Sequence, residues 1–522
     1  MPESPSKKAK AASDFTCDNY VHGRFVAPAS GAYLPIESPV TGATIGKVAL
    51  STAADIEDAV AHAKKAFPAW SGLTVKARAA IMLKFHELMR KHADELADLV
   101  VLENGKNKSE ALASVLKGNE TVEYACSLPQ LVQGKTLEVS RGITCTETRD
   151  PLGVIVSVVP FNFPVMVPMW TVPIALTTGN CVILKPSEKV PITMTKVASF
   201  LAEAGVPAGV FQVHTAPFLW VAAYRTKIIH GQVEAVTSLV DHPDVSAVTF
   251  VGSSPVAQLI ARRCRAQDKR VLALGGAKNH LVALPDADLE LASKDIVASF
   301  AGCAGQRCMA ASVLLLVGSG TELLDMVVHR AQNLTRGTGA GQVGAVIDAA
   351  SQKRIIKYID DAEAGGATVL VDGRPWATAT KGQGYWVGPT VLLHTNPADA
   401  AMHEEIFGPV LSVYKVQSGE EALAIENASP FGNAACVYTS HGGHAEYFTR
   451  RFHAAMIGVN IGVPVPREPF SFGGLYGSRS KYGDMDITGD GCVEFCTHRR
   501  KVTAKWSIHE GSLDRANFAG QM

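Results

Sequence analysis

The sequence lacks an excess of charge of either sign. Its 522 residues include 49 lysines and arginines and 49 aspartates and glutamates, so the formal net charge is +0. A protein that binds nucleic acid or an anionic membrane surface needs a positive field, and this balance does not supply one. We therefore expect a small-molecule partner, and neither nucleic acid nor a membrane.

The sequence also lacks a proline-free hydrophobic run long enough to cross a membrane. Residues 154–176 carry no charge, but prolines interrupt them at positions 160, 164, 168 and 173. This spacing favours a buried turn and helix. Near the N-terminus no apolar run follows the lysines, and no arginine precedes Arg24. The sequence therefore does not predict a secretory signal and matches a mitochondrial presequence poorly.

Cysteines are dispersed, unlike those of a small disulfide-rich protein. Ten are spread along the chain, and we expect a reducing, intracellular compartment. Cys492 and Cys496 with His498 could be metal ligands, but no second pair has matching spacing, so we predict no metal site. Cys303 could form a disulfide or pack as a small apolar residue, and we favour packing.

Apolar runs and amphipathic stretches alternate through most of the chain. The apolar runs predict strands near 154–159, 181–184, 247–251, 280–284, 312–317 and 409–414. The amphipathic stretches predict helices at 53–67, 77–102 and 192–204. Together they indicate an α/β fold with parallel sheets, helices on both faces, and two or three domains.

Cys308 is the candidate nucleophile, because a fixed positive charge precedes it in the sequence. A guanidinium such as that of Arg307 stabilises a thiolate, the form of cysteine that attacks carbonyl carbons. The alternative for any single cysteine is a small buried residue. Other segments therefore have to support this assignment.

Two segments could hold a dinucleotide. Residues 339–344 match the glycine-rich fingerprint G-x-G-x-x-G, but they follow a helical stretch and no strand, so we expect a loop there. Gly252 and Ser253 fit better, because they end a predicted strand and precede a helix whose amides can face a pyrophosphate. Lys185 and Glu188 suit two ribose hydroxyls, although solvated charges at a strand end are an equal alternative.

With these residues the chain resembles the aldehyde dehydrogenase superfamily over roughly residues 18 to 506. Six motifs occur in the expected order, at residues 160–164, 185–188, 250–254, 274–276, 305–308 and 404–409. The resemblance implies a Rossmann-type parallel-sheet domain that binds NAD, an α/β catalytic domain, and a small β arm that joins subunits into homodimers or homotetramers. We expect a disordered tail at 1–14, the NAD-binding domain at 15–133 and 152–274, the catalytic domain at 275–489, the arm at 134–151 and 490–508, and a C-terminal tail at 509–522.

Ala273 indicates the subfamily. Hydrolytic members of the superfamily have a glutamate at this position, and an alanine cannot activate water against a thioester. With residues 275–280, 305–308 and 463–466, the chain resembles the CoA-acylating methylmalonate-semialdehyde dehydrogenases. This implies coenzyme A as a second substrate and a place in valine or pyrimidine-type catabolism. It also implies the mitochondrial matrix, or the cytoplasm if the N-terminal tail is not a presequence.

The resemblance further implies catalytic and cofactor-binding roles. Cys308 would attack the aldehyde, while Asn162 and the Cys308 amide hold the oxyanion. Phe161, Glu405 and Phe407 would hold the cofactor, although a pair of glutamates elsewhere is usually a solvated face. Hydride would pass to NAD, and the thioester would lose carbon dioxide before coenzyme A attacks it. The products would be propionyl-CoA or acetyl-CoA.

Two cations are expected to bind the substrate carboxylate. Arg307 would do so by charge-assisted hydrogen bonds, and an ion pair that supports its loop is the alternative. Lys117 stands where the family has an arginine, so it keeps the charge but loses the planar bidentate fork. Two rival functions remain open: a hydrolytic, CoA-independent aldehyde dehydrogenase, and a non-catalytic protein of the same fold.

Residues 215–229 depart from the family pattern. Related chains pass almost directly from residue 214 to the His230-Gly231 step, whereas here an apolar segment intervenes. It could be a lid or contact surface near the adenine pocket, or translated intron sequence. We favour the second interpretation, because neither its periodicity nor its turn chemistry fits its neighbours.

Overall fold

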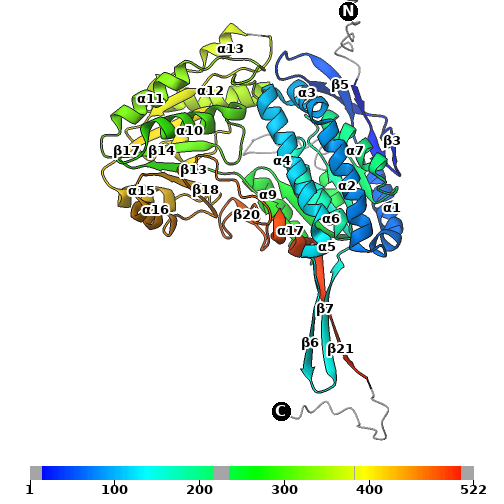
Figure 1. Cartoon of the computed structure of the whole chain (residues 1–522). Coiled ribbons are helices and arrows are strands. Elements are labelled where there is room, and N and C mark those ends of the chain that lie inside the picture. The colour runs from blue at the N-terminus through cyan, green and yellow to red at the C-terminus, as the bar shows by residue number, and fades with distance from the viewer. Residues whose placement is uncertain (1–14, 216–233, 381, 507–522) are drawn as a thin grey trace, which may run out of the picture.

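The computed structural model describes residues 15–215, 234–380 and 382–506, and Figure 1 shows their arrangement. Two large, mostly parallel sheets packed with helices form the body, and a three-stranded arm projects from it. Within these residues, no helix has the length and apolar character needed to cross a membrane. The α/β architecture is confirmed, and the exact domain boundaries stay a prediction.

The first sheet has the strand order β20-β12-β11-β8-β9-β10-β2-β3. Its central parallel strands are β8 (Val154–Val158), β9 (Cys181–Lys185), β10 (Phe211–Val213), β11 (Val245–Val251) and β12 (Arg270–Leu274). Three strands lie antiparallel to their neighbours at the two edges, namely β2 (Asn19–Val21), β3 (Arg24–Val26) and β20 (Lys481–Tyr482). β8 and β9 are buried at every position, as expected of parallel strands covered on both faces.

Helices surround this sheet. They are α1 (Ala53–Ser71), α2 (Val75–Lys91), α3 (Ala93–Asn104), α4 (Lys108–Cys126), α5 (Leu128–Leu131), α6 (Met166–Thr177), α7 (Ile192–Ala204), α8 (Glu234–Asp241) and α9 (Ser254–Arg265). α6 is buried throughout, as the proline-interrupted stretch predicted. The prediction of one helix over 77–102 is wrong, because the chain leaves helical geometry at His92 (φ −106°, ψ 18°). A small sheet joins β1 (Phe15–Cys17), β5 (Thr44–Ala49) and β4 (Tyr33–Glu37).

The second sheet has the order β15-β16-β17-β14-β13-β18-β19 and is parallel except at β15. Its strands are β13 (Asn279–Ala283), β14 (Ala311–Val317), β15 (Thr368–Val371), β16 (Thr390–Leu393), β17 (Val410–Val416), β18 (Ala434–Tyr438) and β19 (Met456–Val459). The helices of this part are α10 (Leu289–Ala301), α11 (Thr321–Gln332), α12 (Ala349–Ala364), α13 (Pro375–Ala379), α14 (Ala400–His403), α15 (Gly419–Asn427) and α16 (Gly442–Thr449). Residues 339–344 form a loop between α11 and α12, as predicted.

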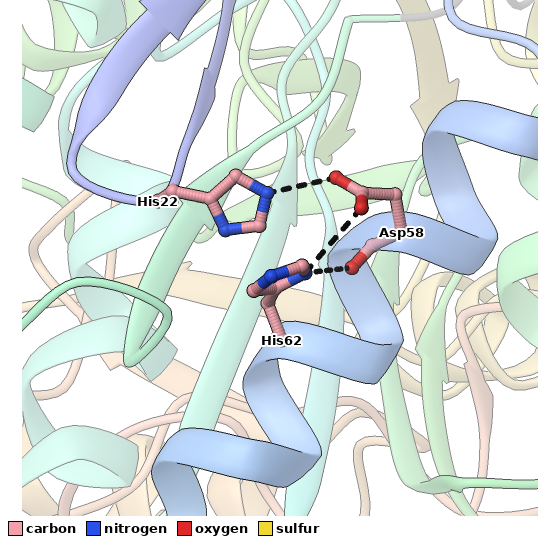
Figure 2. A group of neighbouring side chains, drawn as sticks. All are labelled: His22, Asp58 and His62. Atoms are coloured by element: carbon pink, nitrogen blue, oxygen red, sulfur yellow. Dashed lines mark hydrogen bonds and ion pairs between the residues drawn. The ribbon is translucent and has the colours of Figure 1, made fainter.

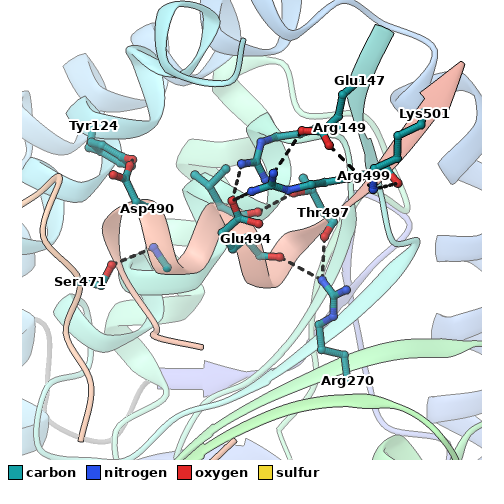
Figure 3. Close-up of polar contacts among 12 residues, drawn as sticks. Tyr124, Glu147, Arg149, Arg270, Ser471, Asp490, Glu494, Thr497, Arg499 and Lys501 are labelled. Carbon is teal, nitrogen blue, oxygen red and sulfur yellow. Dashed lines mark hydrogen bonds and ion pairs between the residues drawn. The ribbon is translucent and has the colours of Figure 1, made fainter. Parts of the chain in front are cut away.

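The arm consists of β6 (Lys135–Ser140), β7 (Ile143–Pro151) and β21 (Thr497–Lys505). Strand β21 directly follows α17 (Gly489–Cys496). Figure 3 shows how charges fix its base. Arg149 and Arg499 both pair with Glu494, and the Arg270 guanidinium donates to main-chain carbonyls at the end of α17. All of β6 is exposed, and Leu137 is 67% exposed.

Candidate active site

Cys308 lies in the loop between α10 and β14, directly after a strained turn, η1 (Gly302–Gly305). Cys303, Ala304 and Gly305 have positive φ angles of 52°, 52° and 68°. A Cβ atom on Gly305 would lie 1.9 Å from the carbonyl oxygen of Gly408, so only glycine fits here. The turn therefore fixes the direction in which the chain presents Cys308. Cys303 is a free, buried thiol, in line with the packing role that we favoured.

A cavity of about 310 Å³ opens beside Cys308. It lies where β8, β11 and β12 end, which is the edge at which parallel sheets usually bind ligands. The segment before β17 closes it from the second sheet. Seven predicted site residues line this one cavity: Phe161, Asn162, Gly252, Ser253, Cys308, Glu405 and Phe407.

Asn162 is buried and faces the Cys308 loop. Its side-chain nitrogen donates to the carbonyl of Gln306 at 3.1 Å. One amide hydrogen is used in this bond, so the second is available for another acceptor. Lys106 donates to the main-chain carbonyl of Asn162 and, at 3.0 Å, to the side chain of Asn104. This buried lysine positions the Asn162 backbone, and sequence reasoning missed it.

Two further asparagines hold the Cys308 backbone. The side chains of Asn279 and Asn433 donate to the Cys308 carbonyl at 2.8 and 2.9 Å. Asn279 begins β13 and Asn433 precedes β18, so both come from the second sheet. Asn279 lies in the 275–280 motif that marked the subfamily, and that motif was the available signal for its role.

The Cys308 thiol is protonated at neutral pH in the protein alone. Burial and then the charge of Glu405 raise its pKa to about 12, while backbone hydrogen bonds and the charge of Arg307 lower it less. Arg307 alone therefore does not produce the thiolate that the sequence suggested, because desolvation outweighs it. A positive charge bound in the cavity would lower this pKa.

Glu405 is half-buried and lines the same cavity. It accepts a hydrogen bond of 2.9 Å from the Ala277 amide, and burial raises its pKa to about 7. A Cβ atom on Gly276 would lie 2.3 Å from the carboxyl oxygen Oε2, so the glycine makes room for this side chain. Burial also lowers the pKa of neighbouring Lys278 to about 7. The Glu405 carboxyl group can therefore form hydrogen bonds with a polar ligand in the cavity.

Two aromatic rings and one buried ion pair complete the predicted cofactor site. Phe161 and Phe407 meet edge to face with ring centroids 5.9 Å apart. Lys185, at the end of β9, forms an ion pair of 3.1 Å with Glu188. Because β9 and β11 flank β8 in parallel, this pair and Gly252 lie at the same edge of the sheet. Phe161, Gly252 and Phe407 line the 310 Å³ cavity, and the Lys185–Glu188 pair is not part of its lining.

The two predicted carboxylate-binding side chains are each occupied by acidic partners. Arg307 lies 3.1 Å from Glu110 and lines a separate cavity of about 1250 Å³ between α4, α10 and α11. Lys117 lies 2.6 Å from Glu120 and 3.8 Å from Glu468. Neither lines the 310 Å³ cavity. The ion pair that we weighed as the alternative for Arg307 is therefore present, and carboxylate binding stays a prediction.

The atypical segment 215–229 lies outside the described residues except for Thr215. Thr215 is buried at the end of β10, and its hydroxyl donates to the carbonyl of Ala49 at 3.1 Å. His214 before it is fully buried, and neither ring nitrogen has a hydrogen-bond partner.

Comparisons with known proteins give matches along nearly the whole chain. The model of the aldehyde dehydrogenase family matches residues 25–502. A protein named malonate-semialdehyde dehydrogenase 1 from Geobacillus thermodenitrificans is 40% identical over 496 residues, which cover 94% of this chain and 99% of that protein.

Two solved structures are similar along nearly their whole length. The methylmalonate-semialdehyde dehydrogenase of Oceanimonas doudoroffii has a TM-score of 0.89 and 38% identity, and the match covers 94% of this chain and 99% of that one. A protein from Sinorhizobium meliloti, described as a methylmalonate-semialdehyde dehydrogenase complexed with NAD, has a TM-score of 0.89 and 34% identity, with 95% and 98% covered.

Proposed function

The chain belongs to the aldehyde dehydrogenase family, and on that premise we propose that it oxidises methylmalonate semialdehyde or malonate semialdehyde with NAD and transfers the acyl group to coenzyme A. The observation that carries the proposal is the single cavity that joins Cys308 to Asn162 and to the predicted cofactor residues. The names of its relatives support the semialdehyde as substrate.

Cys308 is the nucleophile in this proposal. The thiol first gives its proton to water. The sulfur then forms a bond to the aldehyde carbon, the π bond of the carbonyl breaks, and the carbonyl oxygen becomes an oxyanion. The second hydrogen of the Asn162 amide and the Cys308 N–H stabilise that oxyanion, an effect typically worth about 3 to 4 kcal/mol of barrier for one donor. The hydrogen bonds from Asn279 and Asn433 to the Cys308 carbonyl restrain the loop and so orient the sulfur for the attack.

The cavity suits a nicotinamide cofactor. NAD supplies the hydride acceptor when it is bound. Glu405 is held by the Ala277 amide and can accept hydrogen bonds from ribose hydroxyls, while Phe161 and Phe407 offer flat apolar walls. Ser253 caps α9 without a side-chain hydrogen bond to the helix, so the first amides of the helix can face a pyrophosphate.

Release of the acyl group by coenzyme A follows from Ala273. This residue is fully buried on β12, between Phe250 and Tyr482, and carries no group that could deprotonate water. The substrate carboxylate, β to the thioester carbonyl, leaves as carbon dioxide, and the enolate that remains takes a proton from water. The thiol of coenzyme A then forms a new thioester with the acyl group and gives its proton to the departing Cys308 sulfur. The hydrolytic rival lacks its base at this position.

The substrate carboxylate would be bound by Arg307, assisted by Lys117. In the proposal the substrate replaces Glu110 as the partner of Arg307, which exchanges one charge-assisted hydrogen bond for another. The exposed arm, with Trp506 83% exposed at its end, would be covered by a second subunit in a homodimer or homotetramer. The bacterial sources of the relatives support a cytoplasmic location over the mitochondrial matrix.

The test is an assay of NAD reduction with both semialdehydes, with and without coenzyme A. We expect sustained reduction only when coenzyme A is present, and at most about one NADH per site without it. Detection of propionyl-CoA or acetyl-CoA by mass spectrometry identifies the product. Equal steady rates with and without coenzyme A would favour the hydrolytic rival, and no reduction under either condition would favour a non-catalytic protein.

A further inference from the structure

Two histidines and an aspartate converge at an edge of the first sheet. His22 forms the turn between β2 and β3, and Asp58 and His62 lie one turn apart on α1. One potential metal-ligating atom from each residue lies within 4.8 Å of the other two. Figure 2 shows the two imidazoles next to each other, with their ring centroids 3.4 Å apart, and the Asp58 carboxylate to one side of both. None of the three lines the cavity at Cys308.

The spacing of the three side chains is close to that of ligand atoms around a metal ion. His22 Nε2 is 2.8 Å from Asp58 Oδ2, and His62 Nδ1 is 3.4 Å from Asp58 Oδ1. Ligand atoms around a tetrahedral zinc ion are about 3.3 Å apart, given bonds of roughly 2.0 to 2.1 Å. Small rotations of the side chains would therefore place all three around one ion. The His62 ring would give up its 2.8 Å contact with the Asp58 carbonyl, or would ligate through its other nitrogen.

The backbone aims these side chains at one point. His22 and Gly23 have φ angles of 55° and 76°, and the pairing of Val21 with Arg24 leaves them as a two-residue hairpin loop. Both loop positions of such a turn need left-handed geometry, which favours asparagine followed by glycine. A histidine at the first position directs its ring toward α1.

The donor chemistry limits the class of ion. Two imidazoles and one carboxylate are preferred by zinc and by neighbouring transition metals such as cobalt, nickel and copper, whereas magnesium and calcium prefer oxygen ligands. The side chains of His22, Asp58 and His62 are 24%, 54% and 40% exposed, so an ion can enter and water can complete its coordination. In the part of the chain that the structure describes, no other group of three such side chains brings its ligand atoms within 4.8 Å of one another.

We propose that His22, Asp58 and His62 form a binding site for a divalent transition-metal ion, with zinc as the probe. The ion would fasten the β2–β3 hairpin to α1. This link matters because a single residue pair, Val213 with Tyr20, joins β2 to β10 in the sheet. The site is structural and does not depend on the proposed catalytic function.

The test uses the full-length chain without a histidine tag, stripped with a chelator and titrated with zinc chloride. His22→Asn removes one ligand and introduces asparagine, which this type of turn favours, so the variant should fold. His62→Ala removes the second imidazole. His444→Ala is the matched control, because His444 is also exposed, lies beside His441 with ring centroids 4.6 Å apart, and is 3.6 Å from Asp286.

We expect one zinc ion per chain at this site, retained by His444→Ala and by Cys308→Ala, which controls for binding to the catalytic thiol. His22→Asn and His62→Ala should each weaken binding at least about tenfold, since loss of an outer-shell partner alone costs that much. Zinc should raise the thermal midpoint of the parent, of His444→Ala and of Cys308→Ala, but not that of His22→Asn or His62→Ala. Equal zinc affinity in the parent, His22→Asn and His62→Ala would overturn the proposal, as would no binding by the parent.

Discussion

Replacing Gly276 with alanine tests the cofactor-binding role of Glu405 without removing a polar group. The added methyl would lie 2.3 Å from Glu405 Oε2 and 2.9 Å from its carboxyl carbon. The carboxyl group has to move by roughly 1 Å to restore van der Waals contact. Such a shift stretches the bond of 2.9 Å from the Ala277 amide and displaces the group that would bind the ribose.

The expected cost follows from the bond that is disturbed. A hydrogen bond to a charged group contributes about 1.5 to 3 kcal/mol, which corresponds to a loss of roughly 10- to 100-fold in kcat/KM for NAD. The fold should survive, because the colliding group is the end of a flexible side chain. Gly305→Ala provides the contrast, since its methyl would meet the Gly408 carbonyl at 1.9 Å and the backbone cannot yield.

The assay is initial-rate kinetics at varied NAD concentration, together with the thermal midpoint of each variant. Gly442→Ala is the control, because no atom lies within 4 Å of a Cβ at that position. If Gly276→Ala folded and used NAD as well as Gly442→Ala, Glu405 would not contact the cofactor and the reasoning would be wrong.

Local sequence patterns predicted the position of several helices and strands. α7 has the predicted bounds 192–204, and the apolar runs near residues 154 and 181 are β8 and β9. The expected helix over 77–102 failed at His92, because the apolar period continues across the break while His92 starts a new helix and bonds Glu95 at 2.8 Å. Periodicity does not detect a break that leaves the apolar face in register.

Some residues of the candidate site could also be predicted from local motifs, and others depend on contacts between distant parts of the chain. Short motifs predicted the residues of the Cys308 cavity. The motifs at 160–164, 250–254 and 274–276 sit where parallel strands end and share one ligand-binding edge, whereas those at 305–308 and 404–409 precede β14 and β17. The direction of Arg307 depends on Glu110, which is far away in the sequence, and the His22 cluster depends on a hairpin that packs on α1. Local sequence patterns do not reveal such contacts. The position of Arg307 beside Cys308 in the sequence therefore predicted a larger lowering of the thiol pKa than the structure supports.

Four further outcomes are expected. Cys308→Ala should abolish turnover, whereas Arg307→Leu should mainly raise KM for carboxylated aldehydes; unchanged kinetics in Arg307→Leu would leave the Glu110 ion pair as its whole role. Ala273→Glu should speed release of the acyl group without coenzyme A, as measured by steady NADH formation, and no change would show that position 273 does not reach the thioester. Burial lowers the pKa of His214 from 6.5 to about 4. As the pH falls, His214 therefore takes up a proton in the unfolded chain at a higher pH than in the folded chain. His214 therefore costs stability as pH falls from about 6.5 to 4, by up to about 3 kcal/mol, and denaturant unfolding of His214→Leu should show a flatter pH dependence than the parent. Finally, because the pKa of Cys308 is raised to about 12, iodoacetamide should alkylate it slowly at pH 8, at a rate that keeps rising with pH. NAD should speed this reaction at pH 8, since its positively charged nicotinamide would stabilise the thiolate. Mass spectrometry of the Cys308 peptide separates this site from the partly exposed Cys126 and Cys145. Rapid alkylation at pH 8 without NAD would show that the thiolate is already formed. It would then support the first interpretation of Arg307, that its charge stabilises the Cys308 thiolate.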